Sequence, residues 1–423
     1  MSTQPFQGIL IYGASTTYGG IQVLVVRFAE YLRAKGIPFA VLTTPGSRLS
    51  SELQWADQVA IEDIEKGGMH VSHVFVPHVT PLRLNLPWGA LGNAKVLFWA
   101  VHPVEVFFGL VPYGDRVLSI FGQRAKHLVL LMFRSHCNRL RSLMSFLRAK
   151  RAIISMDGAT RRGFAQYYGK EFLDLPIVPL PVPLGEPSSQ HSREVGVLSV
   201  GYLGRMDRFK YSAVKPLLLG LRKVVGKRVA LRLVLVSEGP YLERVVELCS
   251  KLTIEVVNHG FMPNVAARKL LAENADIAVC MGTAALDVAA TGCPTIIIDP
   301  CEKAALLPVP RYRFVHQIVD ATLGEYRDSA GYLPGLYSVA DVLRLLKSDD
   351  TLGEKGRAYV RDVHSPALVF DLLIKRIAAS NLTCSDIEPR AREVSSSYRL
   401  ITERIQRVGR LLIRPRLGRI SVC

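Results

Sequence analysis

Three cationic side chains lie close together in the second half of the chain, directly after a stretch expected to form a strand. Arg205, Arg208 and Lys210 follow the apolar run at 197–203. In open α/β sheets, ligands bind at the carboxyl ends of the strands. The planar fork of an arginine and the mobile charge of a lysine together suit a diphosphate group. We therefore interpret the segment as an anion site, the alternative being a solvated basic loop.

Glycine-rich turns follow two other expected strands. Gly13, Gly19 and Gly20 belong to the turn before a helix expected at 21–35, and a similar turn lies at 282–284. Without side chains the backbone can approach a phosphate closely, and a helix N-terminus favours negative charge. Because the first turn lacks the spacing of a dinucleotide fingerprint, the expected ligand is phosphate-like and not NAD. The alternative is that these glycines serve close packing alone.

The elements that must position these groups alternate between strands and helices, which predicts an α/β fold with parallel strands. The expected strands are 8–12, 39–43, 74–76 and 95–99 in the first half, and 197–203, 231–236, 254–257, 277–279 and 295–298 in the second. Proline and serine concentrate at 176–190 without helical spacing, so a domain boundary is expected there. Two Rossmann-like domains with a cleft between them is the predicted architecture.

Composition narrows the class of protein. The chain has 423 residues, of which 49% are hydrophobic, enough for two globular cores. Its formal charge of +17 favours an anionic partner, which can be nucleic acid, anionic lipid or a phosphorylated substrate. The seven cysteines form no CxxC pair and no zinc-finger spacing, which indicates a reduced cytoplasmic setting. No signal peptide or spanning segment is recognised, so any membrane contact is expected to be peripheral.

Taken in order, these features resemble the retaining GT-B glycosyltransferases of the group 1, or family 4, type, which include bacterial lipopolysaccharide and capsule sugar transferases. The resemblance spans residues 8–365 and rests on the order and spacing of short motifs. The matching positions are Gly19, Gly20, His102, the segment from Gly204 to Lys210, Gly239, Pro240, Gly260, Leu286, Asp287, Gly292 and Pro294. The resemblance implies two facing Rossmann-like domains and a C-terminal helix that crosses back to the first domain.

The resemblance also implies a role for each matched position. Arg205 and Lys210 correspond to the pair that clamps the donor diphosphate, and His102 corresponds to a histidine that faces the donor sugar. Asp287 stands where the family has the acid that binds the ribose. The base is expected against the loop formed by Gly260, Phe261 and Met262. The remaining donor-binding positions are Gly19, Gly20, Gly239, Pro240, Gly282, Thr283 and Ala284.

An enzyme of this family moves a sugar from a nucleotide diphosphate donor, here expected to be a UDP or GDP sugar, to a glycan or lipid-linked acceptor. Cations and helix N-termini neutralise the charge that develops on the departing diphosphate, so no cofactor and no metal are expected. In the family the departing phosphate takes the acceptor proton on the same face. This implies retention of configuration and leaves no protein nucleophile to assign.

Two positions depart from the family pattern. The family has a second acid eight residues before the one that binds ribose, where this chain has Val279. A shortened turn would bring Met281 or Gly282 there instead, so the carboxylate is absent on either alignment. Ser237 replaces a glycine of the Gly-x-Gly-Pro turn, a milder change. The missing carboxylate bears on the identity of the sugar and on activity itself.

A basic and apolar segment between Arg124 and Arg151 suits an anionic bilayer surface. Its expected membrane or acceptor contacts are Arg134, Arg139, Arg141 and Arg148. The stretch 399–419 repeats the pattern. The alternative for the first segment is a core helix with a solvated basic face, and for the second it is disorder. The chain is therefore expected in the cytoplasm, peripheral to the inner face of the cell membrane, with a lipid-linked acceptor in the first domain.

The predicted domains are an acceptor domain at 1–183, a nucleotide-sugar domain at 184–365, a crossover helix at 366–380 and a basic tail at 381–423. Two other functions stay open: a catalytically degenerate GT-B protein that binds membrane or nucleic acid, and a nucleotide-sugar epimerase. Nucleic acid is disfavoured because the first basic segment offers only Phe133 and Phe146 as stacking platforms. An epimerase would need acids and a histidine clustered for proton abstraction, which the sequence does not show.

Overall fold

The computed structural model divides the chain into two compact units. Unit 1 comprises residues 1–156, 160–177 and 372–423, and unit 2 comprises residues 157–159 and 178–371. The structure describes residues 8–14, 20–66, 71–84, 86–102, 106–107, 110–113, 130–186, 194–226, 228–301, 309–327 and 332–413, with the backbone alone at Arg83 and after Arg407. The change of unit at residue 178 falls within the proline-rich stretch where the boundary was expected, ahead of the predicted division at 183.

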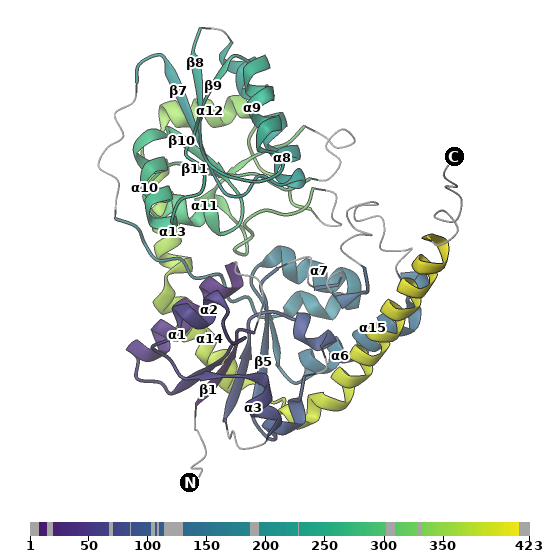
Figure 1. Ribbon diagram of the computed structural model, residues 1–423. Coiled ribbons are helices and arrows are strands. Elements are labelled where there is room, and N and C mark those ends of the chain that lie inside the picture. The colour runs from purple at the N-terminus through teal and green to yellow at the C-terminus, as the bar shows by residue number, and fades with distance from the viewer. Residues whose placement is uncertain are drawn as a thin grey trace, which may run out of the picture. The chain divides into compact units, whose positions relative to one another are not determined.

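Unit 1 is built on a parallel sheet whose six described strands have the order β3-β2-β1-β4-β5-β6. Figure 1 labels β1 and β5 of this sheet. The strands are β1 (Ile9–Tyr12), β2 (Phe39–Leu42), β3 (Gln58–Val59), β4 (His73–Val76), β5 (Lys95–Ala100) and β6 (Ile153–Ser155). The helices are α1 (Gly20–Ala34), α2 (Arg48–Glu52), α3 (Ile61–Glu65), η1 (Thr80–Arg83), η2 (Trp88–Leu91), α6 (Arg134–Ala149), α7 (Gly158–Tyr168) and η6 (Lys170–Asp174). This strand order is that of a Rossmann fold.

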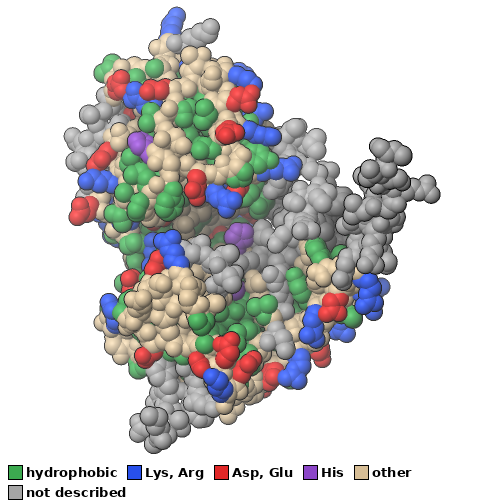
Figure 2. All heavy atoms as spheres, viewed as in Figure 1, with side chains coloured by type: hydrophobic (Ala, Val, Ile, Leu, Met, Phe, Trp, Pro, Cys, Tyr) green, Lys and Arg blue, Asp and Glu red, His purple; other side chains and the backbone are tan. Residues whose placement is uncertain are grey.

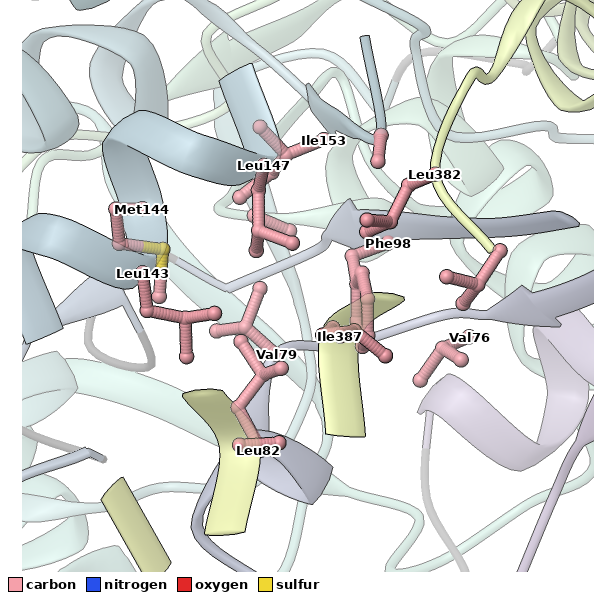
Figure 3. Packing of buried hydrophobic residues seen from close by; sticks show 14 of the residues in the cluster. Val76, Val79, Leu82, Phe98, Leu143, Met144, Leu147, Ile153, Leu382 and Ile387 are labelled. Atoms are coloured by element: carbon pink, nitrogen blue, oxygen red, sulfur yellow. The ribbon is translucent and has the colours of Figure 1, made fainter. Parts of the chain in front are cut away.

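The core of unit 1 settles which side of α6 is apolar. Leu140, Leu143, Met144 and Leu147 recur at helical spacing and are all buried. Figure 3 shows Leu143, Met144 and Leu147 in one cluster with Phe98 of β5. The apolar face of α6 therefore belongs to the core and is not available to a bilayer, whereas Leu131 and Met132, just before the helix, are exposed.

The C-terminal part of the chain packs on unit 1. The helix α14 (Pro366–Ala379) begins in unit 2 and ends in unit 1, close to the predicted crossover helix. Within the range predicted as a basic tail, the structure has a long helix, α15 (Cys384–Ile413). The N–H of Val96 donates to the carbonyl oxygen of Leu382 at 2.9 Å, which fastens the connection between the two helices to β5. Leu382 and Ile387 then join the core cluster, as Figure 3 shows.

Unit 2 repeats the same topology with one reversed strand. Its six described strands have the order β12-β11-β10-β7-β8-β9, and only β12 is antiparallel among them. The strands are β7 (Val197–Leu203), β8 (Ala230–Val236), β9 (Ile254–Asn258), β10 (Ile277–Cys280), β11 (Thr295–Ile297) and β12 (Arg313–Phe314). The helices are α8 (Arg208–Val225), α9 (Leu242–Lys251), α10 (Asn264–Asn274), α11 (Thr283–Ala289), η8 (Val315–Gln317), α12 (Val339–Ser348) and α13 (Leu352–His364).

Each face of the unit 2 sheet has its own apolar cluster, because alternate residues of a strand point to opposite sides. On β10, Ile277 and Val279 join the side chains of α8, α9 and α12, whereas Ala278 and Cys280 join those of α10 and α11. A strand buried on both faces reads as a continuous apolar run, which is why the sequence located these strands well. The predicted α/β class with two Rossmann-like domains is confirmed.

Candidate functional site

The strand order of unit 2 reverses at β7, which pairs with β8 on one side and with β10 on the other. Ligands of open α/β sheets bind at such a switch point, beyond the carboxyl ends of the strands. The loops that leave β7 and β10 carry Arg205 and Gly282, respectively. The structure therefore brings residues predicted to bind the donor to one edge of one sheet.

The loop after β7 presents two cations in different surroundings. Arg205 is exposed, and its Nε lies 3.2 Å from Oδ1 of Asp207. Lys210 is half-buried in the first turn of α8, where a Cβ added at Gly204 would come 3.6 Å from its Nζ. Burial lowers the pKa of Lys210, Asp207 opposes this shift and Arg205 adds to it. A bound anion would relieve the mutual repulsion of the two cations and favour the charged lysine.

The loop after β8 holds the basic loop in place. The N–H of Gly204 donates to the carbonyl oxygen of Val236 at 3.1 Å. The N–H of Met206 donates to the carbonyl oxygen of Glu238 at 2.6 Å. Ser237 adds a side-chain bond, since its Oγ donates to the carbonyl oxygen of Gly204 at 2.8 Å. The serine that departs from the family's glycine therefore joins the two loops rather than leaving a gap.

Gly239 lies beside Met206, where these two loops come close together. Its φ is +126°, and a Cβ there would come 2.8 Å from the carbonyl oxygen of Met206. Only glycine fits this backbone conformation and this space. Pro240 follows it, exposed, just before α9. The Gly239-Pro240 turn thus contacts the backbone of the loop that carries Arg205 and helps to fix its position.

The predicted ribose contact, Asp287, is almost completely buried in α11, with 3% of its surface exposed. Its Oδ2 accepts a hydrogen bond of 2.8 Å from Nδ2 of Asn264, the first residue of α10. Asn264 is itself exposed. Sequence reasoning missed this asparagine, although its place at the start of a helix after the Gly260 loop is a usable signal.

The turn between β10 and α11 uses part of its backbone internally. Gly282 has a φ of +63°, and its N–H donates to the carbonyl oxygen of Leu323 at 2.8 Å. The N–H of Ala285 donates back to Gly282 at 3.1 Å. Thr283 and Ala284 begin the helix between these two bonds. Within the turn predicted to bind an anion, the N–H of Gly282 is therefore already used in a bond to the protein itself.

The loop after β9 carries the predicted base contacts. Gly260 has a φ of +67°, and its N–H donates to Oδ1 of Asn258 at 3.2 Å. Met262 packs half-buried against the core of unit 2. Phe261 between them is 74% exposed. The loop thus exposes one aromatic ring to solvent, three positions before Asn264 in the chain.

Val279, the ungapped position of the family's second acid, lies inside β10 and is buried among the side chains of α8 and α12. No ligand can reach it there. Met281 and Gly282 instead occupy the turn at the carboxyl end of β10. Of the positions considered for the missing acid, only Met281 and Gly282 therefore lie at the strand end where ligands of open α/β sheets bind.

The remaining predicted residues belong to unit 1. Gly19 lies outside the described residues, and Gly20 is the exposed first residue of α1. His102 is exposed two residues after the end of β5. Sequence reasoning missed His78, which follows β4 and contacts the ring of Tyr12 at 5.5 Å between centroids. Since unit 1 reverses its strand order between β1 and β4, Tyr12 and His78 mark its own switch point.

The four arginines of α6 have different surroundings. Arg148 pairs with Asp174 at 2.7 Å, and Arg141 donates to the carbonyl oxygen of Tyr167 at 3.3 Å. Arg134 and Arg139 are exposed and have no ion pair within the described part of the chain. Two of the four predicted surface contacts are thus tied to unit 1 itself, and two are available to a partner.

Among the described residues, no helix combines the length and the continuous apolar character that crossing a bilayer requires. The same described residues contain no group of three or more His, Cys, Asp or Glu side chains placed to hold a metal ion.

Comparison with known proteins shows similarity in structure and not in sequence. No family model matches the chain, and no curated protein matches its sequence. HepE from Anabaena, solved with UDP and glucose, is 12% identical with a TM-score of 0.54, over 88% of this chain and 100% of that one. The lipopolysaccharide outer core galactosyltransferase WaaB is 12% identical with a TM-score of 0.53, over 88% and 99% of the chains. A glycosyltransferase from Rickettsia africae is 14% identical with a TM-score of 0.53, over 87% and 97%.

These likenesses extend over nearly the full length of the solved chains and include both Rossmann-like domains. The predicted GT-B fold is therefore confirmed.

Proposed function

We propose that this protein is a glycosyltransferase that takes a sugar from a nucleotide diphosphate donor bound to unit 2. The observation that carries the proposal is the pair Arg205 and Lys210 at the switch point, on a loop held by the bonds around Gly239. Lys210 is half-buried and lies close enough to Arg205 for the arginine to lower its pKa. Two adjacent cations that are fixed by the backbone are stabilised by a polyanion such as a diphosphate.

In this proposal the chain supplies electrostatic catalysis. Arg205 and Lys210 hold the diphosphate and neutralise the negative charge that grows as the sugar leaves. The loop at Gly260–Met262 holds the base, and His102 keeps the contact with the donor sugar that the resemblance implies. The acceptor oxygen forms the new bond to the sugar carbon, the bond to the diphosphate breaks, and the departing phosphate oxygen takes the acceptor proton. This route retains configuration and uses neither a metal nor a protein nucleophile.

The proposed donor is a UDP or GDP sugar. HepE was solved with UDP and glucose and WaaB is a galactosyltransferase, so UDP hexoses are the first donors to test. The proposed acceptor is a glycan or a lipid-linked sugar of lipopolysaccharide or capsule synthesis.

A membrane-bound acceptor is supported by one surface of unit 1. The helices α6 and α15 run antiparallel, because Ser142 bonds to Arg390 at 3.3 Å and His136 bonds to Ser397 at 2.7 Å. The start of α6 therefore lies beside the part of α15 that follows Ser397. The acid Glu403 is exposed in this part of α15. The exposed apolar and cationic side chains there are Leu131, Met132, Arg134, Arg139, Arg399, Leu400, Arg404 and Arg407.

We name these eight residues the basic apolar end. Figure 2 shows Lys and Arg side chains interspersed with acids along α15. Cations beside exposed apolar side chains favour an anionic bilayer surface. This surface supports the proposal that the enzyme is a peripheral protein at the inner face of the cell membrane.

Binding of nucleotide sugars in the absence of added metal tests the proposal. We expect calorimetry to detect binding of one UDP or GDP sugar to the wild type. Arg205→Ala/Lys210→Ala should weaken it by at least about tenfold, since two charge-assisted contacts are lost. The matched control is Lys215→Ala/Lys223→Ala, which removes two exposed cations elsewhere on α8. Equal binding by both double variants would overturn the assignment of the diphosphate site.

Val279 motivates a second candidate function. Because the acid that the resemblance leads one to expect is missing on either alignment, a degenerate GT-B protein that binds lipid without transfer is the competing proposal. It predicts binding of anionic vesicles with no binding of any nucleotide sugar and no sugar transfer to lipid acceptors. Sugar transfer that depends on Arg205 would exclude it.

A further inference from the structure

The hydrogen bond between Asn264 and Asp287 joins two elements that are 23 positions apart in the chain. Asp287 lies on α11 with 3% of its surface exposed, and Asn264 is the exposed first residue of α10. The Nδ2 of Asn264 lies 2.8 Å from Oδ2 of Asp287. A hydrogen bond therefore connects the buried carboxylate of Asp287 to an amide at the surface of unit 2.

This contact fixes the orientation of the amide. A carboxylate only accepts hydrogen bonds, so the asparagine must turn its nitrogen toward Asp287. The amide oxygen, Oδ1, is then directed away from the acid. No hydrogen-bond partner for this oxygen occurs among the described residues. Asn264 thus presents a preoriented acceptor.

Asn264 links the loop proposed to hold the base with the helix that follows the switch-point turn. It directly follows the loop of Gly260 and Phe261 proposed to hold the base, and its partner Asp287 lies on the helix after the β10 switch-point turn. In a nucleoside diphosphate the ribose lies between the base and the phosphates. Its two hydroxyl groups donate hydrogen bonds and need acceptors at this place.

We propose that Asn264, and not Asp287, is the residue that contacts the donor ribose, with Asp287 acting as a positioning residue that orients the amide. The inference rests on the proposed function and names the recognition element of the same site. An aspartate is one methylene shorter than the glutamate expected from the resemblance. The exposed amide of Asn264 extends from this shorter acid toward the surface. Asn264 accepts a hydrogen bond from a ribose hydroxyl through Oδ1.

Deoxynucleotides test this assignment. The probes are UDP or GDP, whichever the wild type binds, and the corresponding 2′-deoxy and 3′-deoxy nucleotides, measured by calorimetry. We expect the wild type to bind one deoxy analogue about tenfold more weakly than the ribonucleotide, the net effect of one hydrogen bond that replaces a bond to water. In Asn264→Ala this discrimination should disappear, while both nucleotides still bind. The control is Asn274→Ala at the other end of α10, which should discriminate as the wild type does.

The ratio of the two affinities separates recognition from folding. A lower fraction of folded protein weakens the apparent affinity for both ligands by the same factor and leaves the ratio of the two affinities unchanged. Asn264→Ser provides a second variant without the amide, since serine is favourable at the start of a helix. Asp287→Asn should reduce the discrimination without abolishing binding, because the amide of residue 264 loses its fixed orientation.

Two results would overturn the inference, and they differ. Full ribose discrimination in both Asn264→Ala and Asn264→Ser would show that another group contacts the ribose and would leave the proposed function standing. Absence of any nucleotide binding by the wild type would remove the proposed function and this inference with it.

Discussion

A Cβ placed on Gly239 would lie 2.8 Å from the carbonyl oxygen and 2.9 Å from the nitrogen of Met206. Gly239 ends the loop after β8, and Met206 lies next to Arg205 in the loop after β7. The close approach lets the N–H of Met206 bond to Glu238 at 2.6 Å. The position of the cation at the switch point thus depends on a glycine in a neighbouring loop.

Gly239→Ala should displace the basic loop and weaken donor binding. The added methyl group clashes with backbone and is strained at a φ of +126°, so we expect a loss of about 2–4 kcal/mol in unfolding free energy. Gly226→Ala is the control, because its φ is +64° but nothing lies within 4 Å of its Cβ. Chemical denaturation and nucleotide calorimetry would measure both effects. If the two variants bound nucleotide equally well, the two loops would not be coupled as described.

Val279→Glu should prevent folding, whereas Met281→Glu should be tolerated. Val279 is 3% exposed within β10, so the glutamate would bury a carboxylate among apolar side chains at a cost of several kcal/mol. Met281 lies half-buried in the turn at the carboxyl end of the strand. Soluble yield and thermal unfolding would distinguish the two variants. A stable Val279→Glu protein would contradict the alignment that places the family's acid in the turn.

Acid should destabilise unit 2 through His364. Its Nδ1 donates to the carbonyl oxygen of Leu180 at 2.8 Å, and its Nε2 is buried with no partner in the described part of the chain. Burial lowers the pKa of His364 to about 4. Because the unfolded pKa is about 6.5, this contribution to stability is complete above pH 6.5 and is lost as the pH falls toward 4.

From pH 7 to pH 5 this histidine should cost roughly 2 kcal/mol of unfolding free energy. His364→Asn keeps a donor for Leu180 but has no group that titrates in this range, so its stability should fall less steeply over the same interval. Urea unfolding at both pH values, followed by the fluorescence of the protein, measures the difference. Equal losses in the two proteins would show that His364 is not responsible.

Charge reversal at the basic apolar end should release the protein from anionic membranes. Arg134→Glu/Arg139→Glu changes the two exposed cations of α6, each of which contributes about 1 kcal/mol near a negative surface. We expect at least about a tenfold loss of affinity in co-sedimentation with phosphatidylglycerol vesicles. Co-sedimentation with vesicles of phosphatidylcholine alone should not change. Lys215→Glu/Lys223→Glu makes the same change in net charge on α8. If that control lost binding equally, net charge rather than this surface would be responsible.

The strands and the basic loop could be predicted from the sequence because their signals are local. A strand buried on both faces is a continuous apolar run, as at 197–203, and the turn that follows it is rich in glycine and charge. Arg205 and Lys210 were found in this way, with the spacing of a known motif. The α/β class and the two domains follow from the same alternation.

Only the tertiary structure decided which surface each amphipathic residue faces and which distant residues meet. The apolar side of α6 could face either a core or a bilayer by its spacing, and packing against β5 and α15 assigned it to the core. The pairing of Asn264 with Asp287 depends on two helices brought together by the sheet, a contact that no local pattern encodes. Periodicity specifies that a side must be buried, but the partner that buries it is set by long-range packing.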